Sequence, residues 1–283
     1  MFNIDSIGFW IKVYAVILSL VTGIKSTAKI RHWWKTRYLQ RVWGLKNGDA
    51  VTVVCSELDN PVVRQNVEPR EFIYSLKYGD VDAFFEVVVT LLRLYPNIKL
   101  HVMSAGEVED TRLDLTRHLI VIGGPDYNSL AERVLSWRIT QFEYRSPDSP
   151  SQSAQHPDEI VIYDKLAGKE YCHTDNTKDF GYFERTVNPH NPDSRLVLIG
   201  GCHTIGVTGA VKAFSMAESD EGKIPRGVLR NALTVAKRIR REKSFSVLVQ
   251  AERIGQTISI PVVQAENVAV IGCLESHRLK QGN

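Results

Sequence analysis

Short apolar runs alternate along this chain with longer stretches in which apolar residues recur three and four positions apart. The short runs are rich in Val, Ile and Leu and predict buried strands at 50–55, 98–103, 119–122 and 196–199. The periodic stretches predict helices that begin near residues 80, 129, 205 and 225. Strands that alternate with helices form parallel sheets with right-handed crossovers. The pattern therefore predicts an α/β fold with a Rossmann-like, mostly parallel sheet.

Shorter alternating runs outside this series predict antiparallel strands at the edges of the sheet. They occur in two groups, at 159–163, 170–173 and 182–187 and then at 245–250, 257–263 and 267–271. The loop 253–256 contains Gly255 and predicts that the strands on either side of it form a hairpin. The Ser-, Pro- and Gln-rich stretch 146–157 predicts a surface connection, and a boundary within the body would fall there.

Residues 7–24 form an apolar stretch that is interrupted by a single charge, Lys12. A helix of this length extends about 27 Å, close to the thickness of the hydrocarbon core of a bilayer. The segment 25–46 contains seven Lys and Arg residues, no acid and several aromatic residues, which is typical of the cytoplasmic end of a membrane anchor. We therefore expect residues 1–46 to form an apolar helix and a basic Trp-rich segment, and residues 47–283 to form the α/β domain.

This arrangement predicts a single-pass protein of the inner membrane, attached through residues 7–24, whose C-terminal domain lies in the cytoplasm. The alternative is a helical hairpin that packs on the domain or on another copy of the chain through the tryptophans of the basic segment. Lys12 favours this alternative, because a charge within an apolar span is costly.

Charge and cysteine content narrow the function classes. The net charge is +3, and removing the seven positive charges of the basic segment leaves −4, so a general nucleic-acid-binding face is not indicated. The four cysteines form no C-x-x-C pair, which favours free thiols in a reducing compartment over disulfides or a zinc ribbon. The scattered His and Asp residues suggest no metal site.

Two of the predicted parallel strands share the sequence Leu-x-x-Ile-Gly-Gly, at 119–124 and 196–201. Where a strand gives way to glycine and then to a helix, unpaired backbone N–H groups can bind a phosphate. The polar or small residues after the other strands indicate one shared crevice at the sheet edge. The ligand-binding residues predicted on this basis are Ser56, Gly123, Gly124, Asn128, Gly200, Gly201, Thr204 and Gly206. The alternative is that these glycines only allow helices to pack tightly on strands.

Three residues of this crevice are candidates for catalysis: Cys202, His203 and Glu57. Cys202 would need a base from another strand end, such as His173 or His101, because adjacent side chains do not normally face each other. His203 could instead serve Ser56 as a base. Glu57 follows the first strand, where a carboxylate could bind a ribose hydroxyl or act as a general base, or simply cap a helix.

Several short motifs resemble bacterial Rossmannoid proteins and, more distantly, nucleotide-handling modules of the SLOG and TIR type. The motifs are Tyr78-Gly-Asp-Val-Asp-Ala83, Leu119–Asn128, Asp179-Phe-Gly181, Asn188-Pro-His-Asn-Pro192 and Leu198–His203, within residues 50–215. The resemblance implies a bacterial defence effector that binds or cleaves NAD-derived or cyclic nucleotides and carries a membrane segment. It carries over no catalytic residue, and the glutamate motif of a TIR NADase is not found, which favours sensing over cleavage.

The sequence therefore predicts a membrane-tethered cytoplasmic protein that binds a nucleotide or NAD-like ligand, as a sensor or a hydrolase. Two alternatives stay open. One is a Cys/His or Ser/His hydrolase that uses the same crevice, and the other is a scaffold protein without a small ligand. Homo-oligomers are compatible with all three.

Overall fold

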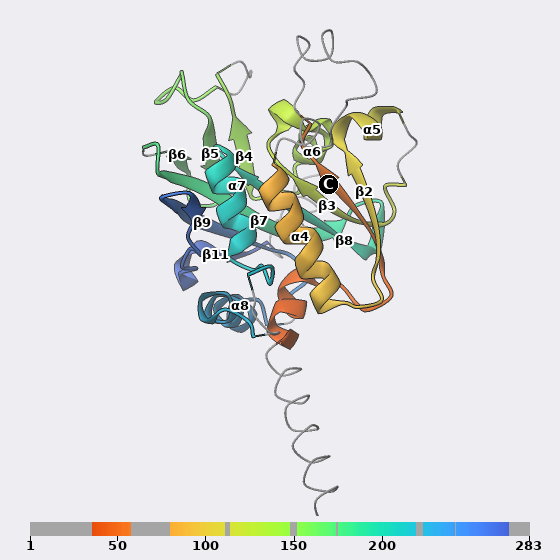
Figure 1. Ribbon diagram of the computed structural model, residues 1–283. Coiled ribbons are helices and arrows are strands. Elements are labelled where there is room, and N and C mark those ends of the chain that lie inside the picture. Colours follow the sequence, from red (N-terminus) through yellow and green to blue (C-terminus); the bar gives the residue numbers. More distant parts are fainter. Residues whose placement is uncertain are drawn as a thin grey trace, which may run out of the picture.

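The computed structural model of the chain describes residues 36–57, 80–110, 114–147, 152–173, 175–218, 223–240 and 242–271, with 109 and 110 described in their backbone only. These residues form a mixed α/β fold (Figure 1). The strands are β1 (Ala50–Cys55), β2 (Lys99–Ser104), β3 (His118–Ile122), β4 (Phe142–Arg145), β5 (Val161–Asp164), β6 (Lys169–Cys172), β7 (Lys178–Asn188), β8 (Asn191–Gly201), β9 (Phe245–Ile254), β10 (Thr257–Ile258) and β11 (Val268–Val270). The helices are α4 (Val81–Leu94), α5 (Ala105–Asp110), α6 (Ser129–Ser136), α7 (Thr204–Lys212) and α8 (Arg226–Ile239), with 3₁₀ turns η2 (Pro125–Tyr127) and η4 (Ala265–Asn267).

The main sheet joins a parallel half to an antiparallel half. Its strand order is β10-β9-β7-β8-β3-β1-β2, and β11 pairs with β9. The pairs among β2, β1, β3 and β8 are parallel, whereas β7 lies antiparallel to both β8 and β9. The predicted α/β sheet of parallel strands with antiparallel strands beyond them is confirmed at this level. The hairpin around Gly255 is also confirmed, as β9 and β10.

The predicted antiparallel group at 159–187 is wrong in one respect. Strands β5 and β6 pair with β4 in a separate three-stranded sheet, whereas residues 182–187 belong to β7 in the main sheet. Strand β7 is buried along most of its eleven residues and pairs with β8 on one edge and β9 on the other, so it is an interior strand of the main sheet. Residues of β6 are only half-buried, as expected at the edge of a small sheet.

Layers of helices and strands cover both faces of the main sheet. Alternate side chains of β3 point to opposite faces, so Ile120 and Ile122 join one core while Leu119 and Val121 join the other. The first core lies under α4, α7 and α8, and α4 and α7 lie side by side in Figure 1. The second core lies under α6 and the small sheet. The edge at which the parallel strands end therefore has helices on one face of the sheet and α6 with the small sheet on the other.

The helical residues 36–43 belong to the first core. Trp43 is fully buried, its ring meets that of Phe183 edge-on at 5.2 Å, and its Nε1 donates a hydrogen bond to the carbonyl of Phe214 at 3.3 Å. Arg185 donates hydrogen bonds from its guanidinium to the carbonyls of Arg41 and Val42. The last part of the predicted 1–46 segment is thus packed into the α/β body.

The apolar stretch 7–24 lies outside the described residues. Among the helices that the structure does describe, none is both long enough and apolar enough to cross a bilayer.

Candidate functional site

The carboxyl ends of the parallel strands lie at one edge of the sheet. At this edge the order in which strands are added to the sheet reverses. After β1 the chain adds β2 on one side through α4, and then crosses back to add β3 on the other side of β1. Strand β8 lies next to β3, and the backbone N–H of Gly123 donates a hydrogen bond to the carbonyl of Ile199 at 2.9 Å. The two Gly-Gly junctions, at 123–124 and 200–201, therefore lie side by side at this edge.

Ser56 and Asp80 form a buried pair at the end of β1. The Ser56 hydroxyl donates a hydrogen bond to Asp80 Oδ2 at 2.5 Å, and the two residues are 1% and 8% exposed. Gly123 lies directly against them, since a Cβ atom at this position would be 2.7 Å from both Asp80 Oδ2 and Ser56 Cβ. Its φ of +102° also favours glycine. Burial raises the pKa of the Asp80 carboxyl group, and the Ser56 hydroxyl opposes that rise.

Glu57 and Asn128 each use their side chains at the start of a helix. Glu57 Oε2 accepts a hydrogen bond from the backbone N–H of Gly106 at 2.8 Å in the first turn of α5. Asn128 caps α6 by accepting from the N–H of Ala131, and its amide donates to the carbonyl of Ile122. Asn128 is 1% exposed, so its amide stabilises the junction between β3 and α6.

The predicted ligand-binding glycines 124 and 200 are both covered by tyrosine rings. A Cβ atom at Gly124 would lie 3.1 Å from the Tyr144 ring, and one at Gly200 would lie 2.5 Å from the Tyr182 ring. The Tyr144 hydroxyl donates a hydrogen bond to Asp126 Oδ2 at 2.8 Å, which ties β4 to the turn after β3.

Helix α7 packs on the main sheet through glycines. A Cβ atom at Gly206 would overlap the carbonyl of Phe180, and one at Gly201 would lie 2.5 Å from the backbone nitrogen of Val207. Strand and helix approach each other more closely than any side chain would allow. These contacts match the packing interpretation of Gly201 and Gly206.

The start of α7 is occupied by a carboxylate from β7. Asp179 Oδ2 accepts hydrogen bonds from the backbone N–H groups of His203 at 2.9 Å and Gly206 at 2.7 Å. Asp179 is 1% exposed, and burial raises the pKa of its carboxyl group while these N–H groups oppose the rise. Thr204 does not cap the helix, because His203 occupies the cap position and Asp179 supplies the acceptor. Thr204 is exposed at the rim.

Cys202 lies in surroundings that do not activate a thiol. It is 2% exposed, and its Sγ donates a hydrogen bond to the carbonyl of Tyr171 at 3.3 Å. Burial, followed by the nearby Asp179 carboxylate, strongly raises the pKa of this thiol, so the nucleophilic thiolate is disfavoured. His203 is exposed, and its ring meets that of His173 edge-on at 4.9 Å. Ser56 is paired with Asp80, as described above.

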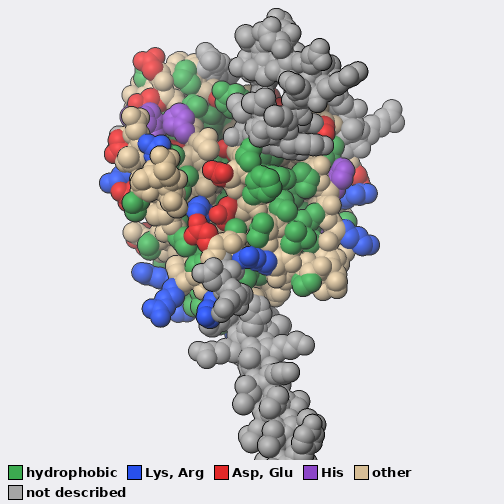
Figure 2. All heavy atoms as spheres, viewed as in Figure 1, with side chains coloured by type: hydrophobic (Ala, Val, Ile, Leu, Met, Phe, Trp, Pro, Cys, Tyr) green, Lys and Arg blue, Asp and Glu red, His purple; other side chains and the backbone are tan. Residues whose placement is uncertain are grey.

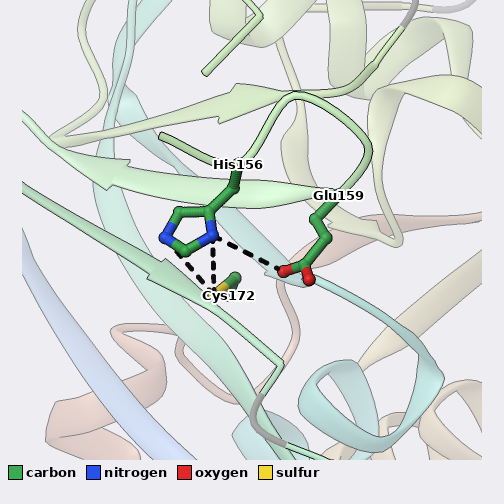
Figure 3. A group of neighbouring side chains, drawn as sticks. All are labelled: His156, Glu159 and Cys172. Carbon is green, nitrogen blue, oxygen red and sulfur yellow. Dashed lines mark hydrogen bonds and ion pairs between the residues drawn. The ribbon is translucent and has the colours of Figure 1, made fainter. Parts of the chain in front are cut away.

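Sequence reasoning missed a cluster of His156, Glu159 and Cys172 beside the small sheet (Figure 3). Their potential ligand atoms all lie within 4.8 Å of one another. Burial, followed by the Glu159 carboxylate, raises the pKa of the Cys172 thiol. The signal was present as His-x-x-Glu with a Cys-His pair downstream, but this spacing belongs to no familiar metal motif.

The cavity of about 310 Å³ between α4, α7 and β10 includes none of the predicted site residues. It is lined by Phe85, Thr208 and Ile258 and by Lys212, whose Nζ lies 3.7 Å from Glu86 Oε1.

Comparison of the chain with protein families, with curated proteins and with solved structures gave no match.

Proposed function

We propose that this protein binds a small nucleotide-type ligand where the ends of β1 and β3 meet. The observation that carries the proposal is the strand order β2-β1-β3-β8, in which β2 is added on one side of β1 and β3 on the other, so that the strand order reverses between β1 and β3. Open α/β sheets bind their ligands outside the carboxyl ends of strands at such a reversal. Gly123 brings backbone close to the Ser56–Asp80 pair at this point, which is the kind of close approach that binding sites of this type use.

The start of α4 is the best position for a phosphate group. Backbone N–H groups at the starts of α5, α6 and α7 donate hydrogen bonds to protein side chains, namely Glu57, Asn128 and Asp179. By contrast, the Asp80 side chain at the start of α4 makes no capping hydrogen bond within the part of the chain that the structure describes, and it is bonded to Ser56. Free N–H groups at the start of a long helix attract anions. We therefore propose the ligand site at the first of the two Gly-Gly junctions on which the sequence predicted it.

The ribose of such a ligand would meet the acidic groups of this edge. Asp126 is exposed after β3 and is an acceptor suited to ribose hydroxyls. A second phosphate would be repelled by Asp126 and Glu57 unless a cation accompanied it. The chemistry favours a ligand with few phosphates for each ribose, as in NAD-derived or cyclic nucleotides.

Mass spectrometry of small molecules released from the purified native protein tests the proposal most directly. Mononucleotides, NAD and cyclic dinucleotides are then added in turn while the melting temperature is measured, and we expect one class to raise it. Ser56→Ala should weaken binding of this ligand about tenfold, because the Asp80 side chain at the start of α4 loses the hydrogen bond that positions it.

The matched control is Ser246→Ala, which removes an equally buried hydroxyl that is bonded to Gln141 in the antiparallel half. It should reduce stability without changing affinity. For the exposed carboxylate, Asp126→Ala is compared with Asp193→Ala at the opposite end of β8. A folded protein that responds to no nucleotide and releases none would refute the proposal.

The attachment of this domain to a membrane through residues 7–24 is part of the same proposal, supported by the sequence alone. Val16→Asp combined with Leu20→Asp should move the full chain from the membrane fraction to the soluble fraction. Equal fractionation of the variant and the wild type would exclude a spanning segment.

A further inference from the structure

Histidine side chains gather over the small sheet, at the upper left of Figure 2. His156 and Glu159 come from the loop before β5, and Cys172 ends β6. Cys172 Sγ lies 3.9 Å from both ring nitrogens of His156, and His156 Nδ1 lies 3.9 Å from Glu159 Oε2 (Figure 3). A thiol, an imidazole and a carboxylate therefore point toward one another around a common centre.

Two polar atoms, one in this cluster and one next to it, are buried without a hydrogen-bond partner among the described residues. They are Glu159 Oε2 and Nδ1 of His173, and they lie 3.9 Å apart. A buried acceptor without a partner costs roughly 1–3 kcal/mol, and native proteins rarely leave one. A cation bound by His156, Glu159 and Cys172 would give Glu159 Oε2 a partner.

The loop that carries His156 is held in place by other side chains. The Ser153 hydroxyl accepts hydrogen bonds from the backbone N–H groups of Gln155 and His156, and donates one to Glu170 Oε2 at 2.5 Å. Glu170 in turn forms an ion pair with Arg145 at 2.6 Å. The strands β4 and β6 therefore fix the position of His156, as supporting residues do around metal ligands.

We propose that His156, Glu159 and Cys172 bind a zinc ion, with the fourth position of the tetrahedron left to water. A thiolate excludes Mg²⁺ and Ca²⁺, which take oxygen ligands, and the mixture of sulfur, nitrogen and oxygen is typical of Zn²⁺. Tetrahedral zinc places neighbouring ligand atoms about 3.3–3.5 Å apart, so the side chains would rotate to shorten the present separations, which are within 4.8 Å. Binding releases the thiol proton of Cys172 to solvent.

The zinc ion would fasten the loop before β5 to the end of β6. Through the contact between His173 and His203, this site also adjoins the start of α7 at the edge of the main sheet. The proposal stands on the cluster itself and does not depend on nucleotide binding at β1 and β3.

The test uses the full chain after removal of metals by chelation. Titration with Co²⁺ should give the thiolate charge-transfer band and the intense visible bands of tetrahedral cobalt, saturating at one ion per chain. Zn²⁺ should bleach these bands by displacing Co²⁺ and should raise the melting temperature. Wild-type protein that gives no thiolate band, or no saturation at one ion per chain, overturns the proposal.

Variants assign the ligands. Cys172→Ser should abolish the charge-transfer band, and His156→Ala should weaken Co²⁺ binding by at least about tenfold. His101→Ala is the control, because His101 is exposed on β2, outside the cluster. If Cys172→Ser does not fold, Glu159→Gln keeps the size of the side chain and should still weaken binding. Co²⁺ binding that Cys172→Ser, His156→Ala and Glu159→Gln all leave unchanged would place the metal elsewhere.

Discussion

The carboxylate of Asp179 on β7 accepts a hydrogen bond from the backbone N–H of Gly206 in the first turn of α7, at 2.7 Å. A strand of the antiparallel half thereby closes the start of the helix that follows the parallel strand β8. The same helix lies so close to β7 that Gly206 has no room for a side chain. The start of α7 is therefore part of the packed core, and the ligand position proposed above lies at α4.

Asp179→Ala should lower the free energy of unfolding by about 2–3 kcal/mol, because the N–H groups of His203 and Gly206 lose a buried charged acceptor. Urea denaturation followed by circular dichroism measures this loss. Asp193→Ala, which removes an exposed carboxylate, should change stability by less than about 0.5 kcal/mol. Equal effects of the two substitutions would contradict the role of Asp179.

Gly206→Ala should destabilise the protein by about 3 kcal/mol, since its Cβ would overlap the Phe180 carbonyl and lie 2.8 Å from Asp179 Oδ2. Gly227→Ala in α8 is the matched control, because its Cβ would meet only the Ile260 side chain, at 3.2 Å. Alanine favours helix there by up to about 1 kcal/mol. The melting temperature should therefore fall much further for Gly206→Ala than for Gly227→Ala. Similar changes in melting temperature would argue against tight packing at α7.

Glu184 should make stability depend on pH. It is fully buried, and burial raises the pKa of its carboxyl group from 4.5 to about 8, opposed by hydrogen bonds from the backbone N–H groups of Gln141 and Phe142. The folded protein therefore holds a proton that the unfolded chain releases. This contribution to stability is complete below about pH 4.5 and is lost as the pH rises to about 8.

Glu184→Gln removes that dependence because glutamine stays neutral. Between pH 5 and 8 the wild type should lose stability relative to the variant, by at most about 1.4 kcal/mol per pH unit. Urea denaturation of both proteins at several pH values gives the difference. Parallel curves across this range would show that Glu184 does not bind the proton.

Trp43→Ala should lower the free energy of unfolding by about 3–5 kcal/mol, because the ring is fully buried against Phe183 and its Nε1 is bonded to the Phe214 carbonyl. Chemical denaturation monitored by fluorescence or circular dichroism would measure it. A cost below about 1 kcal/mol would mean that residues 36–46 are not part of the α/β core.

Among the thiols that the structure describes, Cys172 should react with iodoacetamide first. Cys55 and Cys202 are 0% and 2% exposed, and burial raises the pKa of Cys55 to about 12. Mass spectrometry of folded protein that is freed of metals and then treated for increasing times should find these two unmodified while Cys172 is labelled. Rapid labelling of Cys202 would restore it as a candidate nucleophile.

The sequence was sufficient to predict where the parallel strands lie in the chain, because their apolar runs are buried on both faces. The run 50–55 coincides with β1, and 119–122 with most of β3. It was insufficient for β5 and β6, whose short alternating patterns fit either a separate sheet or the edge of the main one. Pairing places Cys172 opposite Val161, and this brings the cysteine close to Glu159, which no local pattern could show.

The sequence by itself determined the alternation of strands and helices, the two glycine pairs and the polar strand ends, since each depends on residues close together in the chain. Only the tertiary structure decided what those groups contact. Asp179 reaches the start of α7 from another strand, Tyr144 and Tyr182 cover the glycines, and His156 meets Cys172 across the small sheet. The physical reason is that a backbone N–H or a thiol takes whichever partner packing brings to it, and packing joins residues that are distant in sequence.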